Sequence, residues 1–212
     1  MTAAAAVLAR GGAARSRTLA AGALAALVLM ALLGAYAGRH GPLPGEHGLY
    51  DHPLVVAFAG RQAADAEQVL VGLASPVVAI VLVAAIAGVL LEAHERVAAA
   101  LVVAASAVAG ASTVLKPLFG RHALQELAPV AHYPSGHVAF VSAVFGMTGV
   151  VAAAARRPVA AGCCAIPVLG IGPAVLVGGG HVASDVVGGY LLAFAWVALV
   201  LAAAARLAQR PA

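Results

Sequence analysis

Three short segments in the second half of the chain carry the side chains that could do chemistry. In one of them His181 and Asp185 stand four residues apart, so a helix places both on one face. The Asp185 carboxylate can accept a hydrogen bond from the imidazole, which fixes the tautomer of the ring. It also stabilises the cation that forms when the other ring nitrogen attacks a phosphorus atom. The spacing therefore predicts a nucleophilic histidine with its orienting acid. The alternative is a pair that only caps a helix end.

The second segment reads Tyr133-Pro134-Ser135-Gly136-His137 and then turns apolar, which predicts a helix with Ser135 as its N-cap. The backbone N–H groups and positive dipole end of such a helix attract a phosphate, and glycine lets the backbone approach it closely. His137 is suited to protonate a departing alcohol, because histidine titrates near neutral pH. An ordinary capped turn has the same pattern.

Lys116 and Arg121 form the third group. The forked guanidinium of Arg121 can bind two phosphate oxygens, and Lys116 supplies a compact positive charge. Together they would balance the negative charge of a phosphoryl-transfer transition state. Cations at the end of a membrane span also serve as anchors that reach toward lipid head groups. This segment alone is compatible with both roles.

The composition indicates which elements must position these side chains. Of the 212 residues, 63% are hydrophobic and 9% charged, against about 45–50% and about 25% in soluble domains. A membrane span needs about 20 apolar residues. Six stretches qualify: Thr18–Gly38, Val69–Leu91, Val97–Leu115, Val138–Ala155, Val159–Gly180 and Val186–Ala205. The predicted fold is an all-α polytopic membrane helical bundle with six transmembrane helices, one domain over 18–210 after a disordered cytoplasmic tail over 1–17.

The basic residues predict the orientation of this bundle. Eight of the 12 Lys and Arg residues fall on one side, which the positive-inside rule makes cytoplasmic. They are Arg10, Arg15, Arg17, Arg96, Arg156, Arg157, Arg206 and Arg210. Both termini of a multi-pass cell-membrane protein are then cytoplasmic, and the three segments converge outside. The net charge of +4 is scattered over span ends, so nucleic acid is not an expected partner.

Two features of the first half have more than one interpretation. Ala35-Tyr36-Ala37 resembles a signal-peptide cleavage site, but the apolar core exceeds the usual stretch of about 7–15 residues, which favours a retained anchor. Residues 39–68 contain Leu54, Val55 and Phe58 before a polar stretch, which predicts a short interfacial helix. It would serve either as a connector or as a lid over a lipid site.

Other potentially reactive side chains do not form a recognisable site. Cys163 and Cys164 are adjacent in an apolar run, where a helix directs them about 100° apart and strains any disulfide. The remaining scattered histidines lack the paired spacing of a metal or haem site: His40, His47, His52 and His94. No metal and no cofactor is expected.

In order, the three segments resemble the three motifs of the type-2 phosphatidic acid phosphatase superfamily, which also includes vanadium haloperoxidases. The resemblance covers residues 116–190; Pro134-Ser135-Gly136-His137 matches the second motif in full, and His181, Asp185 and Gly188-Gly189 match the third. It implies a membrane lipid phosphatase that forms a phosphohistidine. In that reaction His181 is the nucleophile, Asp185 its orienter, His137 the acid for the leaving group, and Lys116, Ser135 and Gly136 bind phosphate.

The chain departs from this pattern in two places. The first motif normally ends in arginine and proline, where this chain has Ala123 and Leu124, and Arg121 is the candidate replacement. The third motif normally has serine and arginine where this chain has Ala174 and Val175. Losing one charge-assisted phosphate contact can lower a rate by about a hundredfold. His122 and His132 are weaker candidates for compensation.

Two functions from different classes therefore remain. One is a phosphatase acting on a lipid phosphate or diphosphate, with activity reduced by the missing arginine. The other is a weak or inactive relative that binds a lipid phosphate without turnover. A haloperoxidase is disfavoured, because six apolar spans suit a lipid substrate. Membrane lipids are expected partners, and the sequence determines neither the particular lipid nor the oligomeric state.

Overall fold

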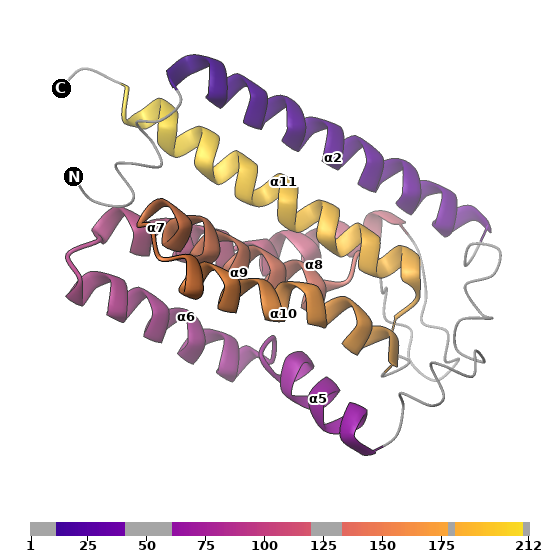
Figure 1. The fold of residues 1–212 in the computed structure, drawn as a ribbon. Helices are drawn as coiled ribbons and strands as arrows, with labels where there is room; N and C mark the ends of the chain where they lie inside the picture. Colours follow the sequence, from indigo (N-terminus) through magenta and orange to yellow (C-terminus); the bar gives the residue numbers. More distant parts are fainter. Residues whose placement is uncertain (1–11, 41–60, 120–132, 178–180, 210–212) are drawn as a thin grey trace.

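A computed structural model describes residues 12–40, 61–119, 133–177 and 181–209. Within these residues the backbone forms eight helices and no strand (Figure 1). They are α2 (Gly12–His40), α5 (Arg61–Gly72), α6 (Pro76–Glu92), α7 (Arg96–Ser106), α8 (Val108–Phe119), α9 (Gly136–Ala154), α10 (Pro158–Val177) and α11 (Ala183–Leu207). The all-α fold class predicted from the composition is confirmed.

Four of these helices, and α7 and α8 taken together, are long and apolar enough to cross a bilayer. Five segments qualify by length and composition: Ser16–Arg39, Arg96–Phe119, Gly136–Ala154, Pro158–Val177 and Ala183–Leu207. A sixth apolar helix, α6, is shorter, with 17 residues. The prediction of a polytopic membrane helical bundle is confirmed, with α6 as its short member.

The predicted second span does not begin where the sequence pattern placed it. Val69 lies in α5, which ends at Gly72, and the membrane helix α6 begins after a turn at Pro76. Ser75 has the extended backbone of an N-cap, and proline fits the first helical position because its missing N–H would have no partner there. Counting apolar residues joined two helices that this turn separates.

The predicted third span is divided at Ala107 into α7 and α8. Backbone groups released by such a break need partners, since the bilayer core has no water to supply them. The Ser106 hydroxyl donates to the Val103 carbonyl at 2.7 Å, and the Trp196 indole N–H donates to the Ala104 carbonyl at 2.9 Å. Side chains thus stabilise the break.

In α10 a side chain from another helix enters the backbone hydrogen-bond ladder. The Tyr190 hydroxyl donates to the Val168 carbonyl at 2.7 Å and accepts from the Gly172 N–H at 3.2 Å, so it bridges two groups that a regular helix joins directly. Pro173 follows immediately and supplies no N–H of its own. The tyrosine hydroxyl thereby joins α11 to the backbone of α10.

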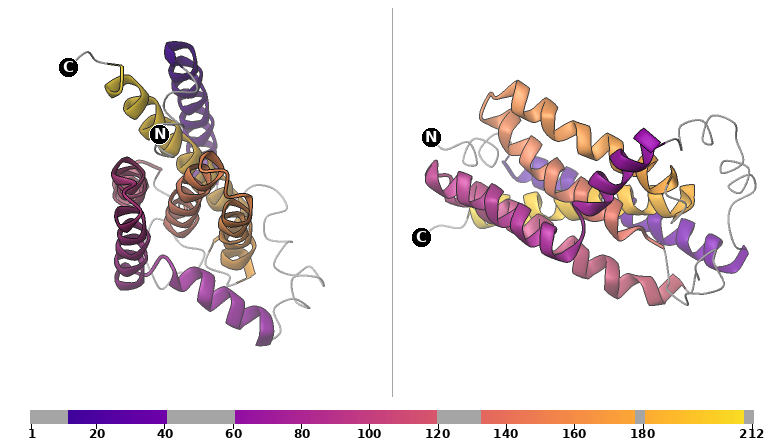
Figure 2. Two further views of the ribbon diagram at one scale, coloured as in Figure 1. Left: turned by 60° about the vertical axis from the view of Figure 1, so that its left-hand side comes forward. Right: turned by 90° about the horizontal axis from the view of Figure 1, so that it is seen from below.

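Helices α7, α8, α10 and α11 pack around α9. Helix α9 packs against α10 and α11 and supplies much of the core, including Val141, Val144 and Met147, while α2 lies along α11. Helix α6 packs mainly on α7 and has no buried residue, so it stands at the side of the bundle (Figure 2). Helix α5 runs obliquely to the long helices and contacts α10. Helix α6 is therefore less buried than the helix α7 on which it packs.

The helix of the connecting segment also begins later than the apolar residues that predicted it. Helix α5 starts at Arg61, and Leu54, Val55 and Phe58 lie outside the described residues. At the other end of the first span, α2 begins at Gly12 rather than at Thr18. The lid interpretation stays a prediction.

The helix ends form two groups at opposite ends of the bundle (Figure 1). At one end α8 finishes and α9 and α11 begin. At the other, the chain reverses at His94 and Arg156, both with a φ near +60° (57° and 59°), and Arg206 donates to Ser16 at 3.3 Å, which joins α11 to α2. The first group of helix ends contains the predicted site residues.

Candidate active site

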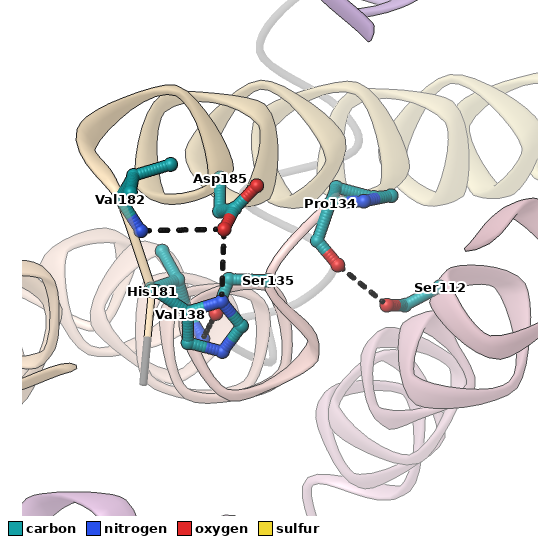
Figure 3. A network of polar contacts seen from close by, with 7 residues as sticks. All are labelled: Ser112, Pro134, Ser135, Val138, His181, Val182 and Asp185. Atoms are coloured by element: carbon teal, nitrogen blue, oxygen red, sulfur yellow. Dashed lines mark hydrogen bonds and ion pairs between the residues drawn. The ribbon is translucent and has the colours of Figure 1, made fainter. Parts of the chain in front are cut away.

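Asp185 and His181 interact at the beginning of α11. The carboxylate oxygen Oδ2 lies 3.3 Å from Nδ1 of His181 and accepts from the Val182 backbone N–H, also at 3.3 Å (Figure 3). His181 is 7% exposed and Asp185 2%. The predicted pair is therefore formed, although His181 precedes the helix instead of sharing a face of it. Nε2, on the opposite side of the imidazole from the carboxylate, is the nitrogen that a nucleophilic role would use.

The second segment is attached directly to this pair. Ser135 is the N-cap of α9, and its hydroxyl accepts from the Val138 N–H at 3.5 Å (Figure 3). Its own N–H donates to the Asp185 backbone carbonyl at 3.0 Å. A Cβ on Gly189 would lie 2.8 Å from the Ser135 carbonyl, so only glycine permits this approach of α11 to α9. The glycine pair of the third segment thus has a packing cause.

The two histidines face each other across this junction. The ring centroids of His137 and His181 are 6.1 Å apart, with an angle of 68° between the ring planes. A general acid or base works at about 2.6–3.2 Å from the atom it serves. Two imidazoles at this separation can both reach one small group placed between or beside them.

Lys116 comes to the same place from the last turn of α8. A Cβ placed on Gly136 would lie 4.0 Å from Nζ of Lys116 and 3.3 Å from the hydroxyl of Ser112. The ammonium group is therefore beside the start of α9, where the helix dipole also favours an anion. The structure brings together every predicted site residue that it describes: Lys116, Ser135, Gly136, His137, His181 and Asp185.

Ser112 is a residue that the sequence interpretation missed. It lies one turn before Lys116 on the same face of α8, is buried, and its hydroxyl is 3.5 Å from the Pro134 carbonyl (Figure 3). That distance is longer than an ordinary hydroxyl hydrogen bond. The available signal was the spacing of four between a serine and a lysine in an apolar run.

The positions that depart from the family pattern have different outcomes. Arg121, and with it His122 and His132, lies outside the described residues, so its predicted role stays a prediction. Val175 is 3% exposed and Ala174 is also buried, and Val175 belongs to the hydrophobic core of the bundle. The position where the family has an arginine is occupied here by a core residue of α10.

A cavity of about 660 Å³ opens from this site between α6, α8 and α9. Lys116, Gly136 and His137 line its polar end. Its walls are largely apolar, with Ile80 and Val83 from α6. Such a cavity suits an amphiphile with an anionic head and a hydrocarbon chain.

Tyr133 braces the second segment from behind. Its hydroxyl donates to the Met30 carbonyl of α2 at 2.5 Å, and its ring meets Phe119 edge-on at a centroid distance of 5.1 Å. A Cβ on either Gly34 or Gly188 would lie 2.5 Å from an atom of this ring. Tyr133 thus connects α2, α8 and α11 immediately before the predicted phosphate-binding turn.

Comparison with known proteins identifies the fold. No family model matches the chain, and a search of curated proteins finds no match. Among solved structures, it resembles the crystal structure of a transmembrane PAP2-type phosphatidylglycerolphosphate phosphatase from Bacillus subtilis, with a TM-score of 0.70 and 14% sequence identity over 89% of this chain and 97% of that chain. The chain has the PAP2 fold. PAP2 denotes the type-2 phosphatidic acid phosphatases, so the resemblance predicted from the three segments is confirmed at the level of the fold.

The PAP2 fold also agrees with the membrane assignment. The matched protein is described as transmembrane, and the apolar helices of this chain make it a multi-pass membrane protein. Within the described residues, no group of three or more histidine, cysteine, aspartate or glutamate side chains is arranged to hold a metal ion.

Proposed function

We propose that this protein is a lipid phosphatase of the type-2 phosphatidic acid phosphatase superfamily that acts through a phosphohistidine. The observation that carries the proposal is the 6.1 Å pairing of His181, which contacts Asp185, with His137, which lines the polar end of a largely apolar cavity. The PAP2 fold supports the same class of activity.

In the proposed first step, Nε2 of His181 attacks the phosphorus of the lipid head group. The bond from phosphorus to the leaving oxygen breaks as the new P–N bond forms, and His137 donates a proton to that oxygen. Asp185 stabilises the imidazolium of His181 through Nδ1. The Lys116 ammonium and the start of α9 stabilise the charge on the phosphoryl oxygens.

In the second step, His137 removes a proton from water and the resulting oxygen attacks phosphorus. The P–N bond breaks, inorganic phosphate leaves, and both histidines return to their starting protonation states. The substrate is a lipid phosphate monoester or diphosphate whose hydrocarbon portion occupies the cavity beside α6. By the positive-inside rule, this site faces outward and the arginine-rich end is cytoplasmic.

A catalytically weak lipid-phosphate-binding protein is the second candidate. The buried Val175 favours it, because α10 contributes no cation from the position where the family has arginine. Binding without turnover over a broad panel of lipid phosphates would select this candidate. Turnover of any member of the panel would select the phosphatase.

The decisive experiment measures phosphate release by the purified full-length protein from a panel of lipid phosphates and diphosphates in detergent with chelator. Wild-type protein is expected to release phosphate and to be inhibited by vanadate, which mimics the five-coordinate phosphorus. His181→Ala should lower the rate by about 10³-fold or more, as loss of a nucleophile does.

His94→Asn is the matched control, because it removes a histidine at the opposite end and asparagine tolerates the left-handed backbone of that position. It should retain wild-type activity. Undiminished phosphate release by His181→Ala would refute the phosphohistidine mechanism.

A further inference from the structure

A second cavity, of about 400 Å³, lies at the opposite end of the bundle. It is bounded by the second half of α6, the last turns of α9, the start of α10 and the two turns that precede α7 and α10. Ile86, Leu90 and Val151 belong to its apolar wall. None of its lining residues lines the active-site cavity, so the two cavities are separate sites beneath the two halves of α6.

The cavity lining is apolar along most of its length and charged at one end, which matches the two parts of an amphiphile. Apart from Thr148, whose hydroxyl donates to the Val144 carbonyl at 2.8 Å, the polar side chains that line this cavity are the charged Glu95 and Arg157. Both charged residues come from the turns, at the end of the apolar wall. Because α6 has no buried residue, hydrocarbon filling the space behind it would cover apolar surface that the protein leaves uncovered.

The charge around the mouth indicates which head group fits. Arg96, Arg156 and Arg157 lie in or next to the two turns, and Arg17 near the start of α2 and Arg206 near the end of α11 lie at the same end of the bundle, against the two acids Glu92 and Glu95. Positive charge is in excess, which favours an anionic lipid over a zwitterionic one. The planar fork of Arg157 suits a phosphodiester, and the Glu95 carboxylate can accept from a head-group hydroxyl.

We infer that this cavity binds an anionic glycerophospholipid, with one acyl chain between α6 and α9 and its phosphate on Arg157. The site needs only the bundle and its charges, so it is independent of the proposed phosphatase activity. Occupancy would support α6, which has no buried residue.

The test measures thermal unfolding of the full-length protein in micelles doped with phosphatidylglycerol or with phosphatidylcholine. Phosphatidylglycerol is expected to raise the melting temperature of the wild-type protein more than phosphatidylcholine does. Arg157→Gln should abolish this difference. Arg156→Gln, which removes the same charge from the neighbouring residue outside the cavity lining, should retain it.

Two further variants distinguish lipid binding in this cavity from general charge attraction and from lipid binding at the active site. Ala152→Leu fills the cavity wall without changing charge and should also abolish the difference between lipids. Lys116→Gln, in the other cavity, should leave it unchanged. The inference is overturned if both lipids stabilise equally, if Arg156→Gln acts like Arg157→Gln, if Ala152→Leu keeps the full difference, or if Lys116→Gln abolishes it.

Discussion

The two ends of the bundle use polar residues in different ways. At the active-site end, Asp185 and Ser135 are buried, the Ser135 N–H donates to the Asp185 backbone carbonyl, and the Asp185 side chain accepts from the Val182 N–H. At the arginine-rich end, Arg96, Arg156 and Arg157 lie in or next to two short turns, and none of them is buried. Polar residues are tolerated at any span end, so their position alone says little about function. Burial together with several hydrogen bonds distinguishes the polar residues that the fold holds in a fixed place.

After loss of the nucleophile itself, the largest expected effect comes from the carboxylate that orients His181. Asp185→Asn should lower kcat by about 10⁴-fold, because an amide can hold the imidazole in the wrong tautomer and cannot stabilise its cation. The measurement is phosphate release at saturating lipid phosphate. Glu92→Gln removes an exposed carboxylate at the other end and should leave kcat unchanged. Equal kcat values for the two variants would show that Asp185 contributes no more to activity than Glu92 at the opposite end.

The next effect tests the close approach of α11 to α9. Gly189→Ala places a methyl group 2.8 Å from the Ser135 carbonyl, so the helices must separate. Overpacking should destabilise the protein by about 1–3 kcal/mol. Displacement of the two histidines by an ångström should lower activity by about 100-fold.

Gly146→Ala is the control for this substitution, because a Cβ there meets nothing within 4 Å. Its melting temperature should equal or exceed that of wild type, since alanine is the better helix former by about 1 kcal/mol. A Gly189→Ala protein with wild-type melting temperature and kcat would show that the contact is not required.

A smaller effect is expected at Ser112. If its hydroxyl turns from the Pro134 carbonyl to a phosphoryl oxygen, Ser112→Ala should raise the inhibition constant for vanadate about fivefold, the equivalent of one neutral hydrogen bond. Ser106→Ala removes a hydroxyl already bonded to the Val103 carbonyl and should not change that constant. Ser112→Thr should restore vanadate affinity; an unchanged constant in Ser112→Ala assigns the serine to packing alone.

The smallest effect is expected behind the site. Tyr133→Phe keeps the ring against Phe119 but loses the hydrogen bond to the Met30 carbonyl, which should cost about 1 kcal/mol of stability. Thermal unfolding measures this loss, and kcat should stay close to that of wild type. A large loss of kcat without a change in melting temperature would instead place the hydroxyl in the chemistry.

The sequence predicted which side chains lie close together more accurately than the bounds of the helices that carry them. The spacing of His181 and Asp185 predicted their contact, which forms even though His181 lies outside the helix. The motif order predicted the PAP2 fold. Neither prediction required the helix boundaries to be correct.

The errors have a common physical cause. Counts of apolar residues measure fit to the bilayer and contain no information on backbone partners. The predicted third span lies within one apolar segment, Arg96–Phe119, but its division at Ala107 was not predicted, because the Trp196 indole that donates to the Ala104 carbonyl lies far along the chain. Ser112 was missed because a single serine in an apolar run does not alter the hydrophobic pattern. Its place in the site becomes visible only from its proximity to Gly136 on another helix.

The contact of Tyr133 with Gly34 and Gly188 has an evolutionary consequence. Each glycine leaves room for the same aromatic ring, so a methyl group at position 34 or 188 is compatible only with a smaller residue at 133. Among diverged descendants of this gene, the three positions should therefore change in correlated fashion. Single changes should be rare, and a reduced side chain at 133 should precede or accompany any enlargement at its two neighbours.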